Sequence, residues 1–82
     1  MNYEKKVKDI LSRLSGVEII VNEETLQRDL ALDSLSMVAM LIELEEVFDI
    51  ELDESDMNPF DLTTVQSVID MVERYKDGDK DE

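Results

Sequence analysis

The sequence contains no cysteine and no histidine. Without cysteine the chain can form neither disulfides nor thiolate metal sites. Without histidine it lacks the commonest general base and metal ligand. Any chemistry must therefore rely on carboxylates, on hydroxyls or on a group that is attached after synthesis.

Long apolar runs and glycine-rich phosphate loops are missing as well. No stretch approaches the ~18 apolar residues that a membrane span requires, and residues 1–8 mix charged with polar side chains. We therefore expect a cytoplasmic protein with no membrane span. A chain of 82 residues makes one domain around one modest core, which leaves little room for an active-site cleft.

Positive charge is scarce. The 22 acidic residues outnumber the 8 basic ones, so the net charge is −14. Such a chain repels nucleic acids and anionic lipids and attracts basic patches on protein partners. The alternative is that the charge serves solubility alone.

Apolar spacing predicts an all-α fold. Residues 3–14 repeat apolar side chains at intervals of three and four, with Asn2 and Gly16 as caps, and this predicts a first helix. Residues 16–31 lack such a period, so we expect an ordered loop that packs Leu26 and Leu30 inward, with a short strand as the alternative. No internal repeat and no second domain is visible.

A central helix is predicted from Leu35 to Phe48, directly after Asp33 and Ser34. Its apolar face is wider than one core-facing stripe, which indicates either that the helix sits between neighbours or that part of it is exposed to a partner. The side chains considered for exposure are Met37, Met40 and Ile42, with core packing as the alternative for each.

The C-terminal third predicts two further elements. Ser55 to Phe60 fits a single helical turn that ends near Pro59. The sequence Thr63-Thr64-Val65-Gln66 is typical of a capping box at the start of a last helix, which we expect to reach about Tyr75. The domain would then span residues 1–76, followed by a polar, disordered tail at 77–82.

Ser34 is the hydroxyl of greatest interest. As a nucleophile it would need an adjacent base, and Asp33 alone is a poor one. A simple capping role for Asp33 or Ser34 is the structural alternative. A hydroxyl at a helix start is exposed and lies at the positive end of the helix dipole, so an attached phosphodiester is favoured there.

Three segments resemble the acyl carrier protein family. They are Asp29-Leu30-Ala31-Leu32-Asp33-Ser34-Leu35, Leu44-Glu45-Glu46-Val47-Phe48-Asp49-Ile50 and Thr63-Thr64-Val65-Gln66. The resemblance covers nearly the whole chain. It implies a small four-helix bundle with a long first loop and a short third helix. It also implies a non-catalytic carrier whose Ser34 holds a 4'-phosphopantetheine arm, donated by coenzyme A, for acyl thioesters of fatty acid, polyketide or related biosynthesis.

The resemblance further implies roles for individual residues. Asp33 and Leu35 would flank the arm, and Glu45 and Glu46 would meet basic patches on a phosphopantetheinyl transferase and on acyl-loading and ketosynthase-type enzymes. Met37 and Ile42 are added as partner contacts because of the wide apolar face. The chain would act as a monomer. The residues implied to line an acyl pocket are Leu44, Phe48, Leu52, Leu62, Val68 and Val72, for which ordinary core packing is the alternative.

Departures from the family pattern suggest a specialised pathway. Ser36 and Ala39 stand at positions that are usually acidic in carriers of fatty acid synthesis, and Leu32 replaces a residue that is often small. Asn58-Pro59-Phe60-Asp61 lengthens the segment before the last helix. A carrier for polyketide, peptide or related synthesis is therefore a serious alternative to a fatty acid carrier.

The rival from another class is an acidic helical interaction or divalent-cation-binding protein with an unmodified Ser34. Acidic residues do gather between Asp49 and Asp56. An EF-hand loop that starts at Asp49 would need glycine at its sixth place and glutamate at its twelfth. The sequence has Glu54 and Phe60 there, so the spacing argues against that calcium site.

Overall fold

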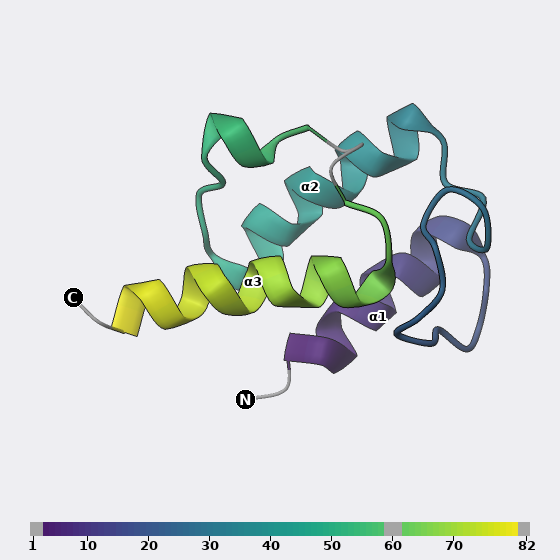
Figure 1. The fold of residues 1–82 in the computed structure, drawn as a ribbon, viewed down its shortest axis with the longest axis horizontal. Helices are drawn as coiled ribbons and strands as arrows, with labels where there is room; N and C mark the ends of the chain where they lie inside the picture. The colour runs from purple at the N-terminus through teal and green to yellow at the C-terminus, as the bar shows by residue number, and fades with distance from the viewer. Residues whose placement is uncertain (1–2, 59–61, 81–82) are drawn as a thin grey trace.

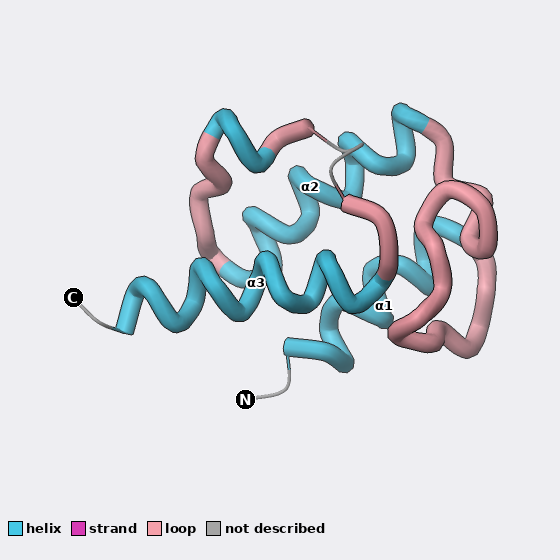
Figure 2. The backbone as a smooth tube through the Cα atoms, viewed as in Figure 1, coloured by secondary structure: helices cyan, strands magenta, loops and turns pink. Residues whose placement is uncertain are grey.

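The computed structural model describes residues 3–58 and 62–80. Within these residues the chain folds into three α-helices, α1 (Tyr3–Ser15), α2 (Ser34–Phe48) and α3 (Val65–Lys80), and a 3₁₀ helix η1 (Glu54–Asp56) (Figure 1). Helix α1 packs against both α2 and α3. In the tube of Figure 2 the described residues contain helices and loops only, joined by one isolated antiparallel bridge between Thr25 and Thr64.

The sequence-based bounds of the first helix are confirmed to within one residue. Tyr3, Val7, Ile10 and Leu11 point one face of α1 into the core. The helix ends at Ser15, and the next residue, Gly16, has a φ of +79°, in the left-handed region that favours glycine. Its N–H donates to the carbonyl of Ser12 at 2.8 Å, so the last turn is closed as expected. The other predicted cap, Asn2, lies outside the described residues.

One hydrophobic core joins all three helices with the first loop. The predicted inward positions Leu26 and Leu30 are both buried. The rings of Tyr3 and Phe48 meet edge to face, with centroids 5.9 Å apart, which ties α1 to the end of α2. The core residues are Tyr3, Val7, Ile10, Leu11, Ile20, Leu26, Leu30, Leu32, Met37, Met40, Leu41, Leu44, Phe48, Ile50, Leu52, Val65, Val68, Ile69, Met71 and Val72.

The first loop is ordered because its backbone caps helix α3. The carbonyls of Asn22 and Glu24 accept the N–H groups of Gln66 at 2.9 Å and Val65 at 3.0 Å. Asn22 Nδ2 also donates to Gln66 Oε1 at 2.7 Å. These bonds satisfy N–H groups at the start of α3 that have no partner within the helix. The expected ordered loop is confirmed, and its alternative, a short strand, is reduced to the single bridge.

The capping box of α3 lies one residue later than the sequence suggested. Thr64 Oγ1 accepts the N–H of Ser67 at 3.2 Å, and Ser67 Oγ accepts the N–H of Thr64 at 3.0 Å. This is the reciprocal pattern of a capping box, with serine in the place usually held by glutamate or glutamine. Gln66, the residue predicted for that place, bonds instead to Asn22 and to Asp70.

Two further expectations need correction. The predicted turn at Ser55 to Phe60 is a 3₁₀ helix at Glu54–Asp56 that begins after Asp53, whose side chain accepts the N–H of Ser55; residues 59–61 lie outside the description. Helix α3 continues through Lys80, beyond the end expected near Tyr75; the disordered tail at 77–82 stays a prediction. The all-α class is confirmed, whereas the four-helix bundle is not, because the described residues form three α-helices and a 3₁₀ turn.

Candidate functional site

Ser34 is the first residue of helix α2, and it is exposed. Asp33 caps the helix in an extended conformation, and its Oδ1 accepts the N–H of Ser36 at 2.8 Å. The carbonyl of Asp33 accepts the N–H of Met37 at 2.9 Å, which starts the helical pattern. The capping role considered for this pair therefore falls to Asp33, and the Ser34 hydroxyl is presented at the positive end of the helix.

The electrostatics of Asp33 argue against general-base chemistry at Ser34. Hydrogen bonds from Ser36, above all from its backbone N–H, lower the pKa of the Asp33 carboxyl below its ordinary value. A carboxylate with a lowered pKa is a weaker base than an ordinary aspartate. The pair Asp33 and Ser34 thus has the geometry of a helix cap with an exposed hydroxyl, and lacks that of an activated nucleophile.

The chain enters this site through a strained turn. Ala31 has a φ of +54°, in the left-handed region where a side chain costs energy. Leu30 and Leu32 on either side of it are buried, and the N–H of Leu32 donates to the carbonyl of Leu26 at 3.0 Å. The two buried leucines hold the turn in place, and the turn fixes the direction in which α2 starts.

An apolar hollow of about 380 Å³ opens next to Ser34 on the outer face of α2. Leu35 is 81% exposed, and Val38 and Ile42 are 43% and 48% exposed. These side chains follow one helix face at intervals of three and four, together with Ala39. We call Leu35, Val38, Ala39 and Ile42 the outer stripe. Leu35 and Ile42 were predicted site residues, whereas Val38 was missed, although its spacing of three from Leu35 and four from Ile42 was a usable signal.

Met37 and Met40 do not belong to the outer stripe. Both side chains are fully buried in the core, which corrects the expectation that Met37 contacts a partner and that either methionine is exposed. The physical reason is that α2 has two apolar faces, and the methionines lie on the face that packs into the core. For these two residues the alternative of core packing holds.

The two glutamates implied for partner binding differ in their surroundings. Glu46 is exposed, one turn beyond Ile42 on the same side of α2. Glu45 is partly buried, and its Oε2 accepts the N–H of Leu52 at 2.9 Å. Glu45 is therefore already engaged in holding the segment that follows α2, whereas Glu46 presents its charge to solvent.

The six residues implied for an acyl pocket lie together in the core. Leu44, Val68 and Val72 are fully buried, and Phe48 and Leu52 are nearly so. Leu62 is partly buried and packs against the same cluster. Their shared location suits both core packing and a lining for cargo, so the implied pocket stays a prediction.

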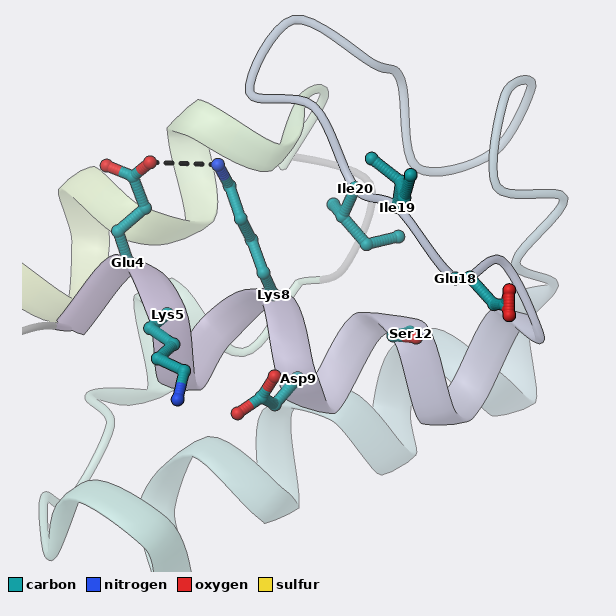
Figure 3. Close-up of a pocket in the computed structure, with 8 residues that line it drawn as sticks. All are labelled: Glu4, Lys5, Lys8, Asp9, Ser12, Glu18, Ile19 and Ile20. Carbon is teal, nitrogen blue, oxygen red and sulfur yellow. Dashed lines mark hydrogen bonds and ion pairs between the residues drawn. The ribbon is translucent and has the colours of Figure 1, made fainter.

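Another hollow, of about 390 Å³, lies between α1 and the start of the first loop (Figure 3). Lys8 Nζ pairs with Glu4 there at 2.8 Å, and Ile19 beside it is 78% exposed. This hollow contains none of the residues implied for the site.

As for the rival hypothesis of a cation-binding protein, the described residues form no group of three or more acids that could hold a metal ion. Nor is any described helix long and apolar enough to cross a membrane.

Comparison with known families gives one match that covers most of the chain. The family model described as "Phosphopantetheine attachment site" matches residues 5–72. This range includes Ser34, the outer stripe and the first half of α3.

Relatives of similar length are acyl carrier proteins. The chain is 38% identical over 76 residues to the one from Buchnera aphidicola subsp. Baizongia pistaciae, covering 90% of this chain and 95% of that protein. It is 36% identical over 77 residues to the one from Desulforapulum autotrophicum, covering 90% and 97%. It is also 37% identical over 78 residues to part of a non-reducing polyketide synthase of Emericella nidulans, which covers 94% of this chain but 3% of that protein.

Proposed function

Because the chain belongs to the phosphopantetheine attachment site family and is an acyl carrier protein, we propose that Ser34 is the residue to which its 4'-phosphopantetheine is covalently attached. The observation that carries this assignment is the exposed hydroxyl of Ser34 at the capped start of α2. A phosphodiester at this point lies at the positive end of the helix dipole, which favours negative charge. When attached, the arm supplies the reactive thiol that a chain without cysteine lacks.

Partner recognition is proposed for the outer stripe and Glu46. An apolar surface flanked by a solvated carboxylate suits a partner enzyme that combines a hydrophobic contact with a basic rim. The transferase and the acyl-loading and ketosynthase-type enzymes would all approach Ser34 from this side. The chain would act as their substrate and have no catalysis of its own.

Several finer features of the prediction belong to the same proposal. We propose that η1 replaces the third helix of the family's four-helix bundle, and that residues 1–76 form the carrier domain. A monomeric state fits the strong negative charge, because self-repulsion opposes association. We also propose a cytoplasmic location. The pathway proposed is fatty acid, polyketide or another specialised synthesis, since the relatives of the chain include both acyl carrier proteins and a polyketide synthase.

The assignment is tested by intact-mass measurement with a phosphopantetheinyl transferase and coenzyme A. We expect the parent to gain one phosphopantetheine, Ser34→Ala to gain none while it keeps its helical circular dichroism, and Ser36→Ala to be modified like the parent. Ser36 is the matched control because it lies two residues away on the same helix. Modification of Ser34→Ala would assign the arm to another residue, and failure of several transferases on the parent would favour the unmodified interaction protein.

A further inference from the structure

The segment that follows α2 and includes η1 packs against one side of the core. We call residues 49–57 the strap. Ile50 and Leu52 of the strap are buried, and Met57 packs partly against the core. Glu51, Asp53, Glu54 and Ser55 are exposed. The strap therefore lays its apolar side chains on the core and turns its charged ones to solvent.

The second half of α3 holds the middle of the strap through Arg74 and Tyr75. The Tyr75 hydroxyl accepts the N–H of Asp53 at 2.8 Å and donates to the carboxylate of Asp56. Arg74 pairs with the other oxygen of Asp56 at 3.1 Å and lies over the ring of Tyr75, 5.6 Å from its centre. Two consecutive residues of α3 thus fix η1 and the residue before it.

The start of the strap is held separately, at the end of α2. Asp49 takes a left-handed conformation, and Ile50 N–H donates to the carbonyl of Glu45 at 3.1 Å. Glu45 also accepts the N–H of Leu52, and Lys76 Nζ donates to the carbonyl of Phe48 at 2.9 Å. This attachment continues helix α2, so it acts as a fixed end. The contacts of Arg74 and Tyr75 lie farther along the strap, at Asp53 and Asp56.

The side chains implied to line an acyl pocket are closed off from solvent. Leu44, Val68 and Val72 are fully buried, so an acyl chain could enter only if a neighbouring segment moved. The strap is suited to that movement because surface hydrogen bonds and one exposed ion pair hold its middle, while the helices are joined by buried apolar contacts. Opening at Asp53 and Asp56 would expose Leu52, which is 7% exposed while the strap is closed.

We propose that Arg74 and Tyr75 are positioning residues that latch the strap over the core and so determine how firmly an acyl cargo is retained inside. This proposal rests on the carrier function proposed above. Tyr75 is the stronger part of the latch, since Arg74 is 63% exposed and its ion pair is screened by solvent. Burial, and then the hydrogen bond to Asp56, raises the pKa of Tyr75, so its hydroxyl keeps the donated proton at neutral pH.

The first test needs no cargo. Amide hydrogen exchange is compared in the parent, in Tyr75→Phe and in Tyr3→Phe, the same chemical change at a buried tyrosine of α1, whereas the hydrogen bonds to Asp53 and Asp56 come from Tyr75. One hydrogen bond to a hydroxyl corresponds to roughly a two- to tenfold change in the opening equilibrium. We expect exchange at Asp53 and Asp56 to be faster by this factor in Tyr75→Phe only, and exchange at Ile50, which is held by Glu45 of α2, to stay as in the parent. Arg74→Gln should give a smaller effect at the same amides.

The second test loads the proteins with acetyl or octanoyl arms by means of a transferase and the corresponding coenzyme A thioester. In the parent and in Tyr3→Phe we expect the octanoyl thioester to react with hydroxylamine more slowly than the acetyl one. In Tyr75→Phe the difference should shrink by the factor seen in exchange.

Each outcome decides a different claim. If strap exchange is unchanged in Tyr75→Phe, or if octanoyl protection is unchanged although exchange is faster, the latch is wrong. If the parent cannot be loaded at all, the carrier function fails and the cargo role falls with it. Should Tyr75→Phe lose its fold, Arg74→Gln supplies the same comparison through an exposed side chain.

Discussion

Helix α2 has two apolar faces that differ in what covers them. Leu41 and Leu44 lie fully buried against the rest of the core, whereas Leu35 and Ile42 on the outer stripe are 81% and 48% exposed. Both faces carry the same kind of side chain, and the three acidic residues of the helix all lie in its second half. One face of α2 is therefore structural, and the other forms an apolar surface beside Ser34.

Because the two faces of α2 share one apolar spacing but differ in burial, apolar periodicity identifies a helix without identifying its function. A small domain rarely exposes several large apolar side chains in a row unless something binds there. The covered face is explained by the stability of the fold, and for the uncovered face we propose contacts with partners. The same substitution made on each face separates the two explanations.

The largest effect is expected from leucine to alanine on the two faces. Leu44→Ala should lower the free energy of unfolding by about 2–5 kcal/mol, since it leaves a cavity in a packed core. Leu35→Ala should change it by about 0.5 kcal/mol or less, because the side chain is mostly in solvent. Urea unfolding monitored by circular dichroism measures both.

The reverse order is expected for function. Leu35→Ala should slow modification of Ser34 by the transferase, because it removes an apolar contact next to the hydroxyl. Leu44→Ala should be modified at the parental rate under conditions in which it is folded. If Leu35→Ala destabilised the protein as much as Leu44→Ala, the outer stripe would be structural and the comparison would fail.

The sequence predicted those features that depend on local pattern. The bounds of α1 and α2, the inward position of Leu26 and Leu30 and the cap at Gly16 follow from apolar spacing and from backbone preferences. The exposed hydroxyl of Ser34 followed from its place before an apolar run. These features depend on residues close in sequence, which is why one sequence suffices for them.

Features that depend on distant residues were missed. Met37 looked as exposable as Ile42, because only the packing of the core decides which apolar face is covered. Gln66 fitted a capping box, but Asn22 of the first loop engages it instead. Helix α3 extends beyond Tyr75. Its residues 74–76 are held in place by contacts of Arg74 and Tyr75 with the strap and of Lys76 with α2.

A smaller effect is expected at the turn that sets the direction of α2. Ala31→Gly should raise the free energy of unfolding by about 0.5–1 kcal/mol, because relief of the left-handed strain exceeds the added flexibility of the unfolded chain. Ala39→Gly is the matched control in the interior of α2 and should lower it by about 0.5–1 kcal/mol. Thermal unfolding of both variants measures the sign. Destabilisation by Ala31→Gly would show that this turn carries no strain.

The smallest effect concerns charge on the outer face. Ala39 lines the hollow beside Ser34, and Ser36 lies in the first turn of α2. A partner that expects acids there would leave basic side chains unpaired at the rim, where one pair is worth about 0.2–1 kcal/mol. The departures at these two positions therefore predict a carrier that serves generic fatty acid enzymes poorly.

We expect Ser36→Asp combined with Ala39→Glu to increase acyl transfer from a malonyl transferase of fatty acid synthesis several-fold at low salt, and the gain to shrink as salt rises, because screening weakens surface ion pairs. The neutral pair Ser36→Asn with Ala39→Gln has similar size and should give no gain. Transfer rates of parent and variants over a salt series provide the measurement. A parent that already matches a fatty acid carrier, or a neutral pair that works as well as the acidic one, would remove the argument for a specialised pathway.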